Sequence, residues 1–383
     1  MTRRGPGVAP EWVDPLPDDL PYATPGGPPS TVPRVAPARR DLPTPALVVD
    51  LDVLEHNLAV AQQLADAHRV GLRPHAKTHK CAEIARRQLA LGARGICVAK
   101  LGEAEALAAA GIDRLLVTSP VHPGWTDRLA ALCAGGVDLS VVVDSAASVN
   151  ALPEASELGV LVDVDVGLHR TGVVDAVVAA ELATRVGDRF RGVQGYGGHW
   201  QHLADPAERA AAVAHGMSLL TAATRAIEAA GLPVGLRTGA GTGTLPHDLE
   251  LGVLDDLQLG SYVFMDREYA DALAGEDRPF RQSLFVDTAV ISANHAGFAT
   301  TDAGLKALAT DAGLPTVAGH SDAGYRWFGD EQGLVSGTWQ VGDRLALVPP
   351  HCDPTVDKYD AIHVVRGDAV VDVWPVTARG RSA

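Results

Sequence analysis

The chain has 383 residues, of which 46% are hydrophobic and 21% are charged, and its 32 basic and 47 acidic side chains give a net charge of −15. It is too apolar for a disordered chain and long enough to bury a large core, while its acidity argues against binding nucleic acid through a general positive field. No stretch reaches the roughly 18 consecutive apolar residues of a transmembrane helix, so we expect a soluble enzyme or small-molecule binder that binds neither nucleic acid nor membranes.

The N-terminal region differs in composition from the rest of the chain. Residues 1–45 contain 12 of the 25 prolines, a density that favours extended, weakly ordered backbone, and we predict a flexible tail over residues 1–30. This region lacks the apolar segment of a secretory signal peptide. The four cysteines show neither a C-x-x-C motif nor the spacing of a disulfide framework, which favours a reducing, cytoplasmic location.

From residue 46 onward, short runs rich in Val, Ile and Leu alternate with Ala-rich segments of helical period that end in glycine. The first run, 46–52, is predicted to be a strand that leads into the helix preceding a barrel. Eight further strands are predicted at 71–78, 95–100, 114–119, 138–145, 159–166, 190–199, 234–238 and 256–262. Near-continuous apolar strands that alternate with helices are typical of a parallel sheet. Eight such units indicate an α/β fold of the (β/α)8 TIM barrel type rather than a doubly wound sheet.

The pattern changes after about residue 275. Segments such as 283–296 and 360–376 alternate β-branched and polar residues and show little helical period. We predict one helix in this part, over 305–313. The predicted domains are therefore a barrel with its lead-in strand over 31–275 and a mostly β C-terminal domain over 276–383.

Polar residues gather where the predicted barrel strands end, which is where TIM barrels carry their chemistry. The first strand ends in Arg73, His75, Lys77, Thr78 and His79, and the fifth leads to Asp165, His169 and Arg170. The sixth ends in Tyr196, His199 and His202, the seventh runs into the segment 237–244, and the eighth runs into Gly260, Ser261 and Tyr262.

The glycine-rich run 237–244, RTGAGTGT, offers backbone N–H groups that no Cβ obstructs, together with three threonine hydroxyls. Such a run suits a phosphate group, and TIM barrels often bind phosphate after strands 7 and 8. The alternative is an ordinary flexible turn. The run does not match G-x-x-x-x-G-K-[ST], so nucleotide hydrolysis is not indicated.

Lys77 is the candidate nucleophile. A lysine at the end of a barrel strand points into the polar mouth, and the nearby cation of Lys80 is expected to lower its pKa. The alternative is a surface lysine paired with a carboxylate. A reactive lysine and a phosphate cradle across one barrel mouth describe a site for pyridoxal 5'-phosphate (PLP), whose aldehyde would react with Lys77.

The triplet His351-Cys352-Asp353 is a candidate metal site. In extended backbone, residues two apart point to the same face, so His351 and Asp353 could bind one divalent metal, with Cys352 turned away. The alternative is a turn with an incidental histidine. One imidazole and one carboxylate favour Mn²⁺ or Mg²⁺, with Zn²⁺ also possible, and two ligands leave positions for water or substrate.

Five segments together carry a family resemblance: RPHAKTHK (73–80), DVGLHRTGV (165–173), GTGT (241–244), GSYVFMD (260–266) and HCDPTVDKYD (351–360). They resemble the metal-activated D-threonine aldolase and D-serine dehydratase family. The members of this family are fold-type III PLP enzymes with an alanine racemase-type barrel and a C-terminal β domain. The resemblance covers about residues 42–375.

The resemblance implies a role for each candidate residue. Lys77 would carry PLP beside His75, Arg170 would lie near the phenolic oxygen, and Tyr196 would contact the ring. His351 and Asp353 would hold the metal, and His202 would act as the base. The phosphate would be held by Thr238, Gly239, Gly241, Thr242, Gly260, Ser261 and Tyr262.

The activity implied is cleavage of a small D-3-hydroxy-α-amino acid to glycine and an aldehyde. Relatives with this activity tend to carry His-x-Asp at the metal, as at His351, whereas dehydratases tend to carry His-x-Cys. The alternatives are elimination to a 2-oxo acid and ammonia from D-serine or D-3-hydroxyaspartate, a non-catalytic PLP-binding protein, and a phosphate-binding barrel without PLP. Gln332 stands where relatives often have His, and the family is typically homodimeric.

Overall fold

A computed structural model of the chain describes residues 38–276 and 278–383. Each of the main strands lies in one of two sheets, one of eight strands and one of nine. The tail predicted over 1–30 lies outside the described residues. Among the described helices, none is both long enough and apolar enough to cross a membrane.

The first sheet is the predicted barrel. Its strands are β2 (Gly71–Leu72), β3 (Ile96–Val98), β4 (Arg114–Pro120), β5 (Asp138–Val143), β6 (Gly159–Asp163), β7 (Phe190–Gly195), β8 (Leu236–Gly239) and β9 (Asp256–Leu257). Every neighbouring pair is parallel, in the order β2-β9-β8-β7-β6-β5-β4-β3. A bridge between His75 and Cys97 joins the two ends of this order. The prediction of an eight-stranded parallel barrel is confirmed.

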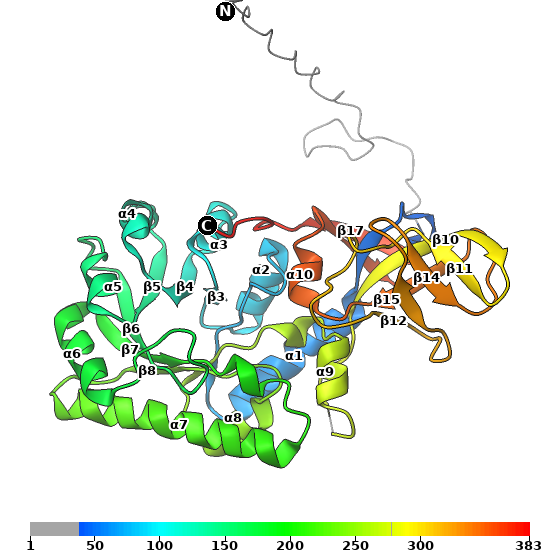
Figure 1. Cartoon of the computed structure of the whole chain (residues 1–383). Helices are drawn as coiled ribbons and strands as arrows, with labels where there is room; N and C mark the ends of the chain where they lie inside the picture. The colour runs from blue at the N-terminus through cyan, green and yellow to red at the C-terminus, as the bar shows by residue number, and fades with distance from the viewer. Residues whose placement is uncertain (1–37, 277) are drawn as a thin grey trace, which may run out of the picture. The chain divides into compact units, whose positions relative to one another are not determined.

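Helices follow most of the barrel strands. They are α2 (Ala82–Leu91), α3 (Leu101–Ala109), α4 (Thr126–Ala134), α5 (Ala146–Asn150), α6 (Ala176–Val186), α7 (Pro206–Ala229) and α8 (Leu245–Leu251). In α7, the Asp205 carboxylate accepts from Ala207 N at the helix start, and Pro206 takes a first-turn position, where its missing N–H costs no hydrogen bond. Figure 1 shows α6 and α7 side by side on the outside of the barrel, and both contact its strands.

The barrel strands are apolar on both faces because both faces are covered. All five residues of β6 are buried. Inside the barrel, Cys97, Leu116, Val142 and Leu161 form a small cluster of their own, one residue from each of four adjacent strands. The helices pack on the outer faces in the main core. The polar strand ends are therefore the part of the barrel left for chemistry.

The second sheet is antiparallel except at one pairing. Its strands are β1 (Ala46–Asp50), β10 (Leu284–His295), β11 (Phe298–Thr301), β12 (Thr316–Val317), β13 (Tyr325–Trp327), β14 (Gly333–Ser336), β15 (Arg344–Val348), β16 (Ala361–Arg366) and β17 (Ala369–Pro375). The exception is β1, which runs parallel to β16 and antiparallel to β10. The strand that we had grouped with the barrel therefore belongs to the second sheet. It leads directly into α1 (Leu51–Ala67), which Asp50 caps by accepting from Val53 N.

The helix predicted over 305–313 is wrong. This segment consists of turns, and its backbone bonds to a neighbouring segment instead of to itself: Leu305 N donates to Gly329 O, and Lys306 N donates to Asp330 O. Ala309 N donates to the Thr355 hydroxyl. These non-local partners override the helical propensity of LKALA.

Three contacts bring the C-terminal part of the chain onto the barrel mouth. Lys80, just after β2, pairs with Asp357 at 2.8 Å. After β17, Ala378 N donates to Lys80 O, and near the C-terminus Ala383 O accepts from Gly102 N at the start of α3. The short helix α10 (Cys352–Val356), which carries the HCDPTV motif, is thereby placed next to the turn that carries Lys77.

Candidate active site

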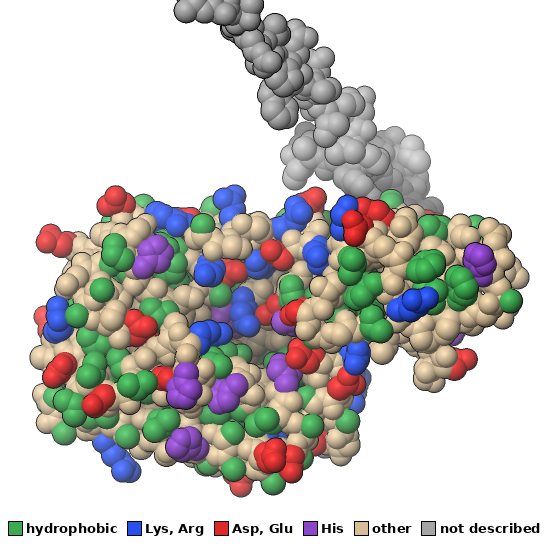
Figure 2. Space-filling view, in the orientation of Figure 1, with side chains coloured by type: hydrophobic (Ala, Val, Ile, Leu, Met, Phe, Trp, Pro, Cys, Tyr) green, Lys and Arg blue, Asp and Glu red, His purple; other side chains and the backbone are tan. Residues whose placement is uncertain are grey.

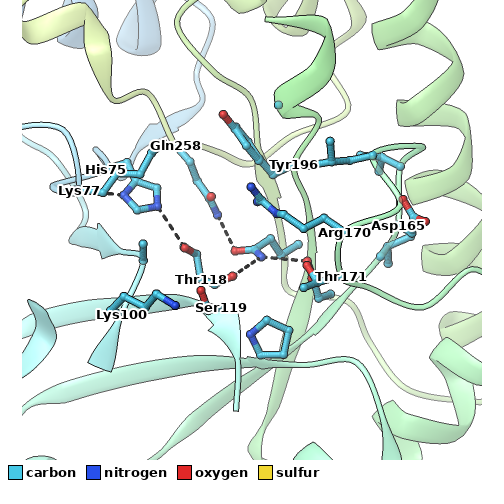
Figure 3. Close-up of a pocket in the computed structure, with 18 residues that line it drawn as sticks. His75, Lys77, Lys100, Thr118, Ser119, Asp165, Arg170, Thr171, Tyr196 and Gln258 are labelled. Atoms are coloured by element: carbon cyan, nitrogen blue, oxygen red, sulfur yellow. Dashed lines mark hydrogen bonds between the residues drawn. The ribbon is translucent and has the colours of Figure 1, made fainter. Parts of the chain in front are cut away.

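A cavity of about 680 Å³ opens at the carboxyl ends of the barrel strands. Figure 2 shows the hollow in this face, with Lys, Arg and His side chains around it. Five residues singled out in the sequence line it, namely His75, Lys77, Asp165, Arg170 and Tyr196 (Figure 3). The cavity is also lined by polar residues that carry no sequence motif, namely Lys100, Thr118, Ser119, Asp163, Thr171, Gln194 and Gln258.

Lys77 lies in the turn after β2, half-buried, with Nζ 3.2 Å from an Asp353 carboxylate oxygen of α10. Asp353 is the main reason that the pKa of Lys77 is raised and not lowered. The expected influence of Lys80 is wrong because its ammonium is already paired, with Asp357 at 2.8 Å and Glu103 at 3.4 Å. Before a cofactor binds, Lys77 is therefore a charged partner of Asp353.

His75 is buried beneath Lys77 and its protonation state follows from its contacts. Lys77 N donates to Nδ1, so Nε2 carries the proton and donates to the Thr118 hydroxyl at 3.1 Å. Thr118 in turn donates to Val98 O. Burial, together with the charge of Lys77, holds the pKa of His75 well below its usual value. His75 is thus a neutral support for the floor of the site (Figure 3).

The loop 165–173 presents Arg170 to the cavity. The Asp165 carboxylate accepts from Gly167 N and His169 N, and it also contacts His169 Nδ1 at 2.8 Å. The Thr171 hydroxyl donates to Asp163 at 2.8 Å. These contacts order the loop before and after Arg170. The Arg170 guanidinium lies 5.7 Å from the centre of the Tyr196 ring, within reach of a cation–π contact.

Two buried glutamines connect the strands below the cavity. Gln258 donates to Gln194 at 3.2 Å and to the Thr238 hydroxyl at 3.0 Å. Gln194 donates to Asp163 at 2.9 Å, and burial raises the pKa of Asp163 to about 6. A glutamine inside a run predicted to be a buried strand could have revealed this network. A buried side-chain amide needs hydrogen-bond partners.

The glycine-rich run lies at the end of β8, and neither it nor Ser261 and Tyr262 is among the residues lining the Lys77 cavity. Thr238 is fully buried under Gln258, and the Thr242 hydroxyl accepts from Tyr262 N at 3.0 Å. The Tyr262 hydroxyl accepts from Gln88 of α2, so both its hydroxyl and its backbone N–H have partners within the chain. Thr242 also lines a second, more apolar cavity of about 420 Å³.

Gly260 joins this region to Lys77. A Cβ built on Gly260 would lie 2.7 Å from the Thr78 hydroxyl oxygen and 3.6 Å from the Cβ of His75, so only glycine fits this approach. The Thr78 hydroxyl is buried and makes no well-formed hydrogen bond among the described residues, although it helps to lower the pKa of Asp353. A hydroxyl in this position can donate either to Asp353 or to an anionic oxygen of a ligand.

His202 lies between the barrel and α9 (Arg267–Ala272). Its ring packs against that of Tyr269, tilted by 48° with 4.6 Å between centroids, and its Nδ1 is 3.9 Å from the Glu268 carboxylate. Burial lowers the pKa of His202, and the charges of His351 and Lys77 act in the same direction. A neutral imidazole at this position can accept a proton at neutral pH.

The HCDPTV segment is not extended as predicted. His351 is the residue before α10, and the chain turns into that helix at Cys352, so the alternation expected of a strand does not apply. His351 Nδ1 lies 2.7 Å from Asp311, and the Cys352 N–H donates to the Asp266 carboxylate. Burial alone would lower the pKa of His351, but the Asp353 and Asp311 carboxylates raise it.

Asp353 is the acidic centre of this corner. Burial alone would raise its pKa, but the charges of Lys77 and His351 hold it well below the usual range. One imidazole and one ionised carboxylate are donors that suit a divalent metal. Among the described residues, no three His, Cys, Asp or Glu side chains are grouped to hold a metal ion.

The arrangement can hold an aldehyde-bearing cofactor with an anionic group. Lys77 supplies an amine at a cavity large enough for such a molecule, Gly260 allows the chain to approach Thr78 and His75 closely, and Arg170 supplies a positive charge. The Asp353 carboxylate, one of the two candidate metal donors, lies 3.2 Å from the amine.

Comparison with known proteins agrees with this arrangement. The family described as "Alanine racemase, N-terminal domain" matches residues 49–268, and the "Putative serine dehydratase domain" matches residues 283–365. The chain is 38% identical to a 3-hydroxy-D-aspartate aldolase of Paracoccus denitrificans, over 89% of this chain and 93% of that protein. It is 38% identical to a D-threonine aldolase of an Arthrobacter species, over 93% and 97%.

A solved structure gives the same result. The crystal structure of D-threonine aldolase from Filomicrobium marinum superposes with a TM-score of 0.85 at 36% identity, over 91% of this chain and 98% of that one. The resemblance seen in the sequence is therefore confirmed, and the chain belongs to the D-threonine aldolase and D-serine dehydratase family, which is built on the alanine racemase N-terminal domain.

Proposed function

We propose that the protein is a PLP- and divalent-metal-dependent lyase that cleaves D-3-hydroxy-α-amino acids to glycine and an aldehyde. The observation that carries this proposal is the contact of Lys77 with Asp353 at 3.2 Å, which brings the proposed cofactor lysine next to a proposed metal donor. The relatives that are 38% identical are named as aldolases of 3-hydroxy-D-aspartate and D-threonine, and this supports the substrate class.

Lys77 would bind the aldehyde carbon of PLP, and Arg170 and Tyr196 would face its ring. The phosphate would be held at Thr238, Gly239, Gly241, Thr242, Gly260, Ser261 and Tyr262. When bound, PLP supplies an electron sink for the bond that breaks at Cα. His75, neutral and fixed by Thr118, would support the ring without adding charge.

His351 and Asp353 would hold the metal, with Mn²⁺ or Mg²⁺ favoured and Zn²⁺ possible because the donors are nitrogen and oxygen. A divalent ion there supplies Lewis acidity to the hydroxyl of the substrate. Asp311, 2.7 Å from His351 Nδ1, would fix the orientation of the imidazole and leave Nε2 for the metal. Carboxylates commonly hold metal-binding histidines in this way.

His202 would remove the proton of the β-hydroxyl. Its Nδ1 has no hydrogen-bond partner among the described residues, and its lowered pKa keeps it neutral. Loss of the hydroxyl proton lets the Cα–Cβ bond break, with the oxygen becoming the aldehyde carbonyl and the electron pair passing to Cα. A proton added at Cα then gives glycine.

The second candidate is elimination of the β-hydroxyl from D-serine or D-3-hydroxyaspartate, giving a 2-oxo acid and ammonia. The match of residues 283–365 to a serine dehydratase domain favours it, while Asp353, in place of the cysteine typical of dehydratases, favours the aldolase. A non-catalytic PLP-binding protein is the candidate of another class. A cytoplasmic location agrees with four buried free thiols, and the homodimer stays a prediction.

A product assay tests the proposal. Protein loaded with PLP and Mn²⁺ is incubated separately with D-threonine, D-serine and 3-hydroxy-D-aspartate. The aldolase produces glycine and an aldehyde in equal amounts, the dehydratase produces ammonia and a 2-oxo acid, and a binding protein produces neither. Ammonia as the main product would overturn the proposed reaction.

A further inference from the structure

Gln201 connects the segment after β7 to the glycine-rich run after β8, and it has no part in the proposed reaction. It follows the short turn 198–200 at the end of β7, only 1% of its surface is exposed, and it reaches across to the glycine-rich run after β8. Its side-chain oxygen accepts from Gly243 N at 3.0 Å. Its side-chain nitrogen donates to the Thr244 hydroxyl at 3.1 Å and to Gly197 O at 3.3 Å. One amide therefore satisfies partners on two strand ends.

The glycine-rich run is pressed directly against Gln201. A Cβ built on Gly241 would lie 2.3 Å from the Gln201 side-chain oxygen, and one built on Gly243 would lie 2.1 Å from the Gln201 backbone oxygen. Ala240, the residue before Gly241, has φ 72°, a conformation that residues other than glycine adopt only when the surroundings impose it. The two glycines are therefore required by the approach to Gln201.

Thr244 extends the contact through the whole loop. Its hydroxyl oxygen accepts from Gln201 Nε2 at 3.1 Å and from Gly241 N at 3.3 Å, and it donates to the buried Asp248 carboxylate at 2.6 Å. All of these atoms are buried, so each donor and acceptor has a fixed partner and the loop has one arrangement.

We propose that Gln201 is the positioning residue for the phosphate of the cofactor: it fixes the loop 239–244 in the conformation that binds the phosphate group. This inference rests on the proposed function, because it takes the bound molecule to be PLP. Gln201 itself does not touch the phosphate. It acts by holding the backbone whose N–H groups would do so.

The chemistry of the amide explains why glutamine suits this position. It offers a donor and an acceptor on one planar group, which Gly243 N and Thr244 both use. Glutamate keeps the acceptor but loses the donor, and it adds a negative charge beside the site of a dianion. Leucine removes both hydrogen bonds and leaves buried partners unpaired.

The test is a cofactor titration that separates the phosphate from the rest of PLP. Cofactor-free wild type, Gln201→Leu and Gln201→Glu are titrated with PLP and with pyridoxal, which lacks the phosphate, and binding is followed by the visible absorption of the lysine-bound cofactor. Gln62→Leu is the matched control: Gln62 is a buried glutamine on α1 that bonds Asp66. A thermal unfolding curve for each variant checks that it is folded.

We expect both Gln201 variants to bind PLP about 10- to 100-fold more weakly than wild type, which corresponds to about 1.4–2.8 kcal/mol. Their affinity for pyridoxal should be unchanged, and Gln62→Leu should match wild type with both ligands. Equal PLP affinity in the wild type and a folded Gln201 variant would overturn the inference, as would an equal loss of PLP and pyridoxal binding. If Gln201→Leu does not fold, Gln201→Glu decides.

The outcome also separates this inference from the proposed function. A wild type that shows no absorption with either ligand contradicts the proposed PLP chemistry as a whole. A wild type that binds PLP tightly, together with variants that bind it equally well, contradicts only the role of Gln201.

Discussion

Arg209 is a buried charged residue, and its removal should lower the stability of the fold and loosen the position of the proposed base His202. It lies on α7 with no exposed surface. Its guanidinium donates to Leu203 O, next to His202 in the chain, to Ala272 O at the end of α9 at 3.4 Å, and to the Glu276 carboxylate. Since α9 also carries Tyr269, against which the His202 ring packs, Arg209 ties together the two segments that position the base.

The expected loss of unfolding free energy follows from how deeply Arg209 and Glu276 are buried. Removing one member of a buried ion pair costs about 3–5 kcal/mol. We expect Arg209→Leu to fall at the lower end, about 3 kcal/mol, because the Glu276 side chain keeps 26% of its surface exposed and can return to water. Arg366→Leu is the control, since Arg366 pairs with Asp52 and Glu55 at the exposed surface, where ion pairs contribute about 0–1 kcal/mol.

Urea unfolding followed by circular dichroism measures both variants against wild type. Arg209→Leu should lose about 3 kcal/mol of unfolding free energy, and its kcat should also fall because His202 is less well held. A loss under about 1 kcal/mol, or one no larger than that of Arg366→Leu, would refute the assignment of Arg209 as a buried clamp.

Three further changes test separate parts of the site. His202→Gln should lower kcat by about 10²- to 10⁴-fold, as loss of a general base does, while PLP absorption is retained; unchanged kcat would remove His202 from the mechanism. His351→Ala, or a chelator added to wild type, should abolish turnover with PLP still bound, and full activity in metal-free protein would contradict the metal role. Burial raises the pKa of Asp248 from 3.8 to about 7, so the folded state holds a proton that the unfolded state releases, and this stabilisation is lost as pH rises through that range. Asp248→Asn should therefore raise the melting temperature, relative to wild type, more at about pH 8 than at about pH 5, and an equal effect at both would contradict the raised pKa.

The barrel could be predicted because its signals are local. Each strand is a short apolar run and each helix has its own period, so the order of strands follows from the chain direction. The placement of Lys77, Arg170 and Tyr196 at one cavity follows from a second local fact, namely that all three follow parallel strands whose carboxyl ends share one mouth.

The features that sequence reasoning missed depend on distant partners. The pairing of β1 with β10 and β16 joins segments from opposite ends of the chain, and nothing in 46–52 specifies it. The raised pKa of Lys77 comes from Asp353, whose position depends on how the second sheet sits on the barrel mouth. The segment 305–313 has helical composition, but its N–H groups find acceptors at Gly329 and Asp330.

The buried amides were missed for a related reason. Gln194, Gln201 and Gln258 have no motif, and each is informative only once its partners are known. A glutamine inside a strand or beside a glycine-rich run is the kind of signal that a sequence offers for such a network, because a buried amide without partners is costly.

The identity of the lysine that carries the cofactor tests the central claim most directly. Protein loaded with PLP is reduced with borohydride and digested, and its peptides are analysed by mass spectrometry. We expect one modified peptide, with the reduced cofactor on Lys77 and unmodified Lys80 beside it. Cofactor on Lys80 or Lys100, or no modified peptide at all, would contradict the site described above.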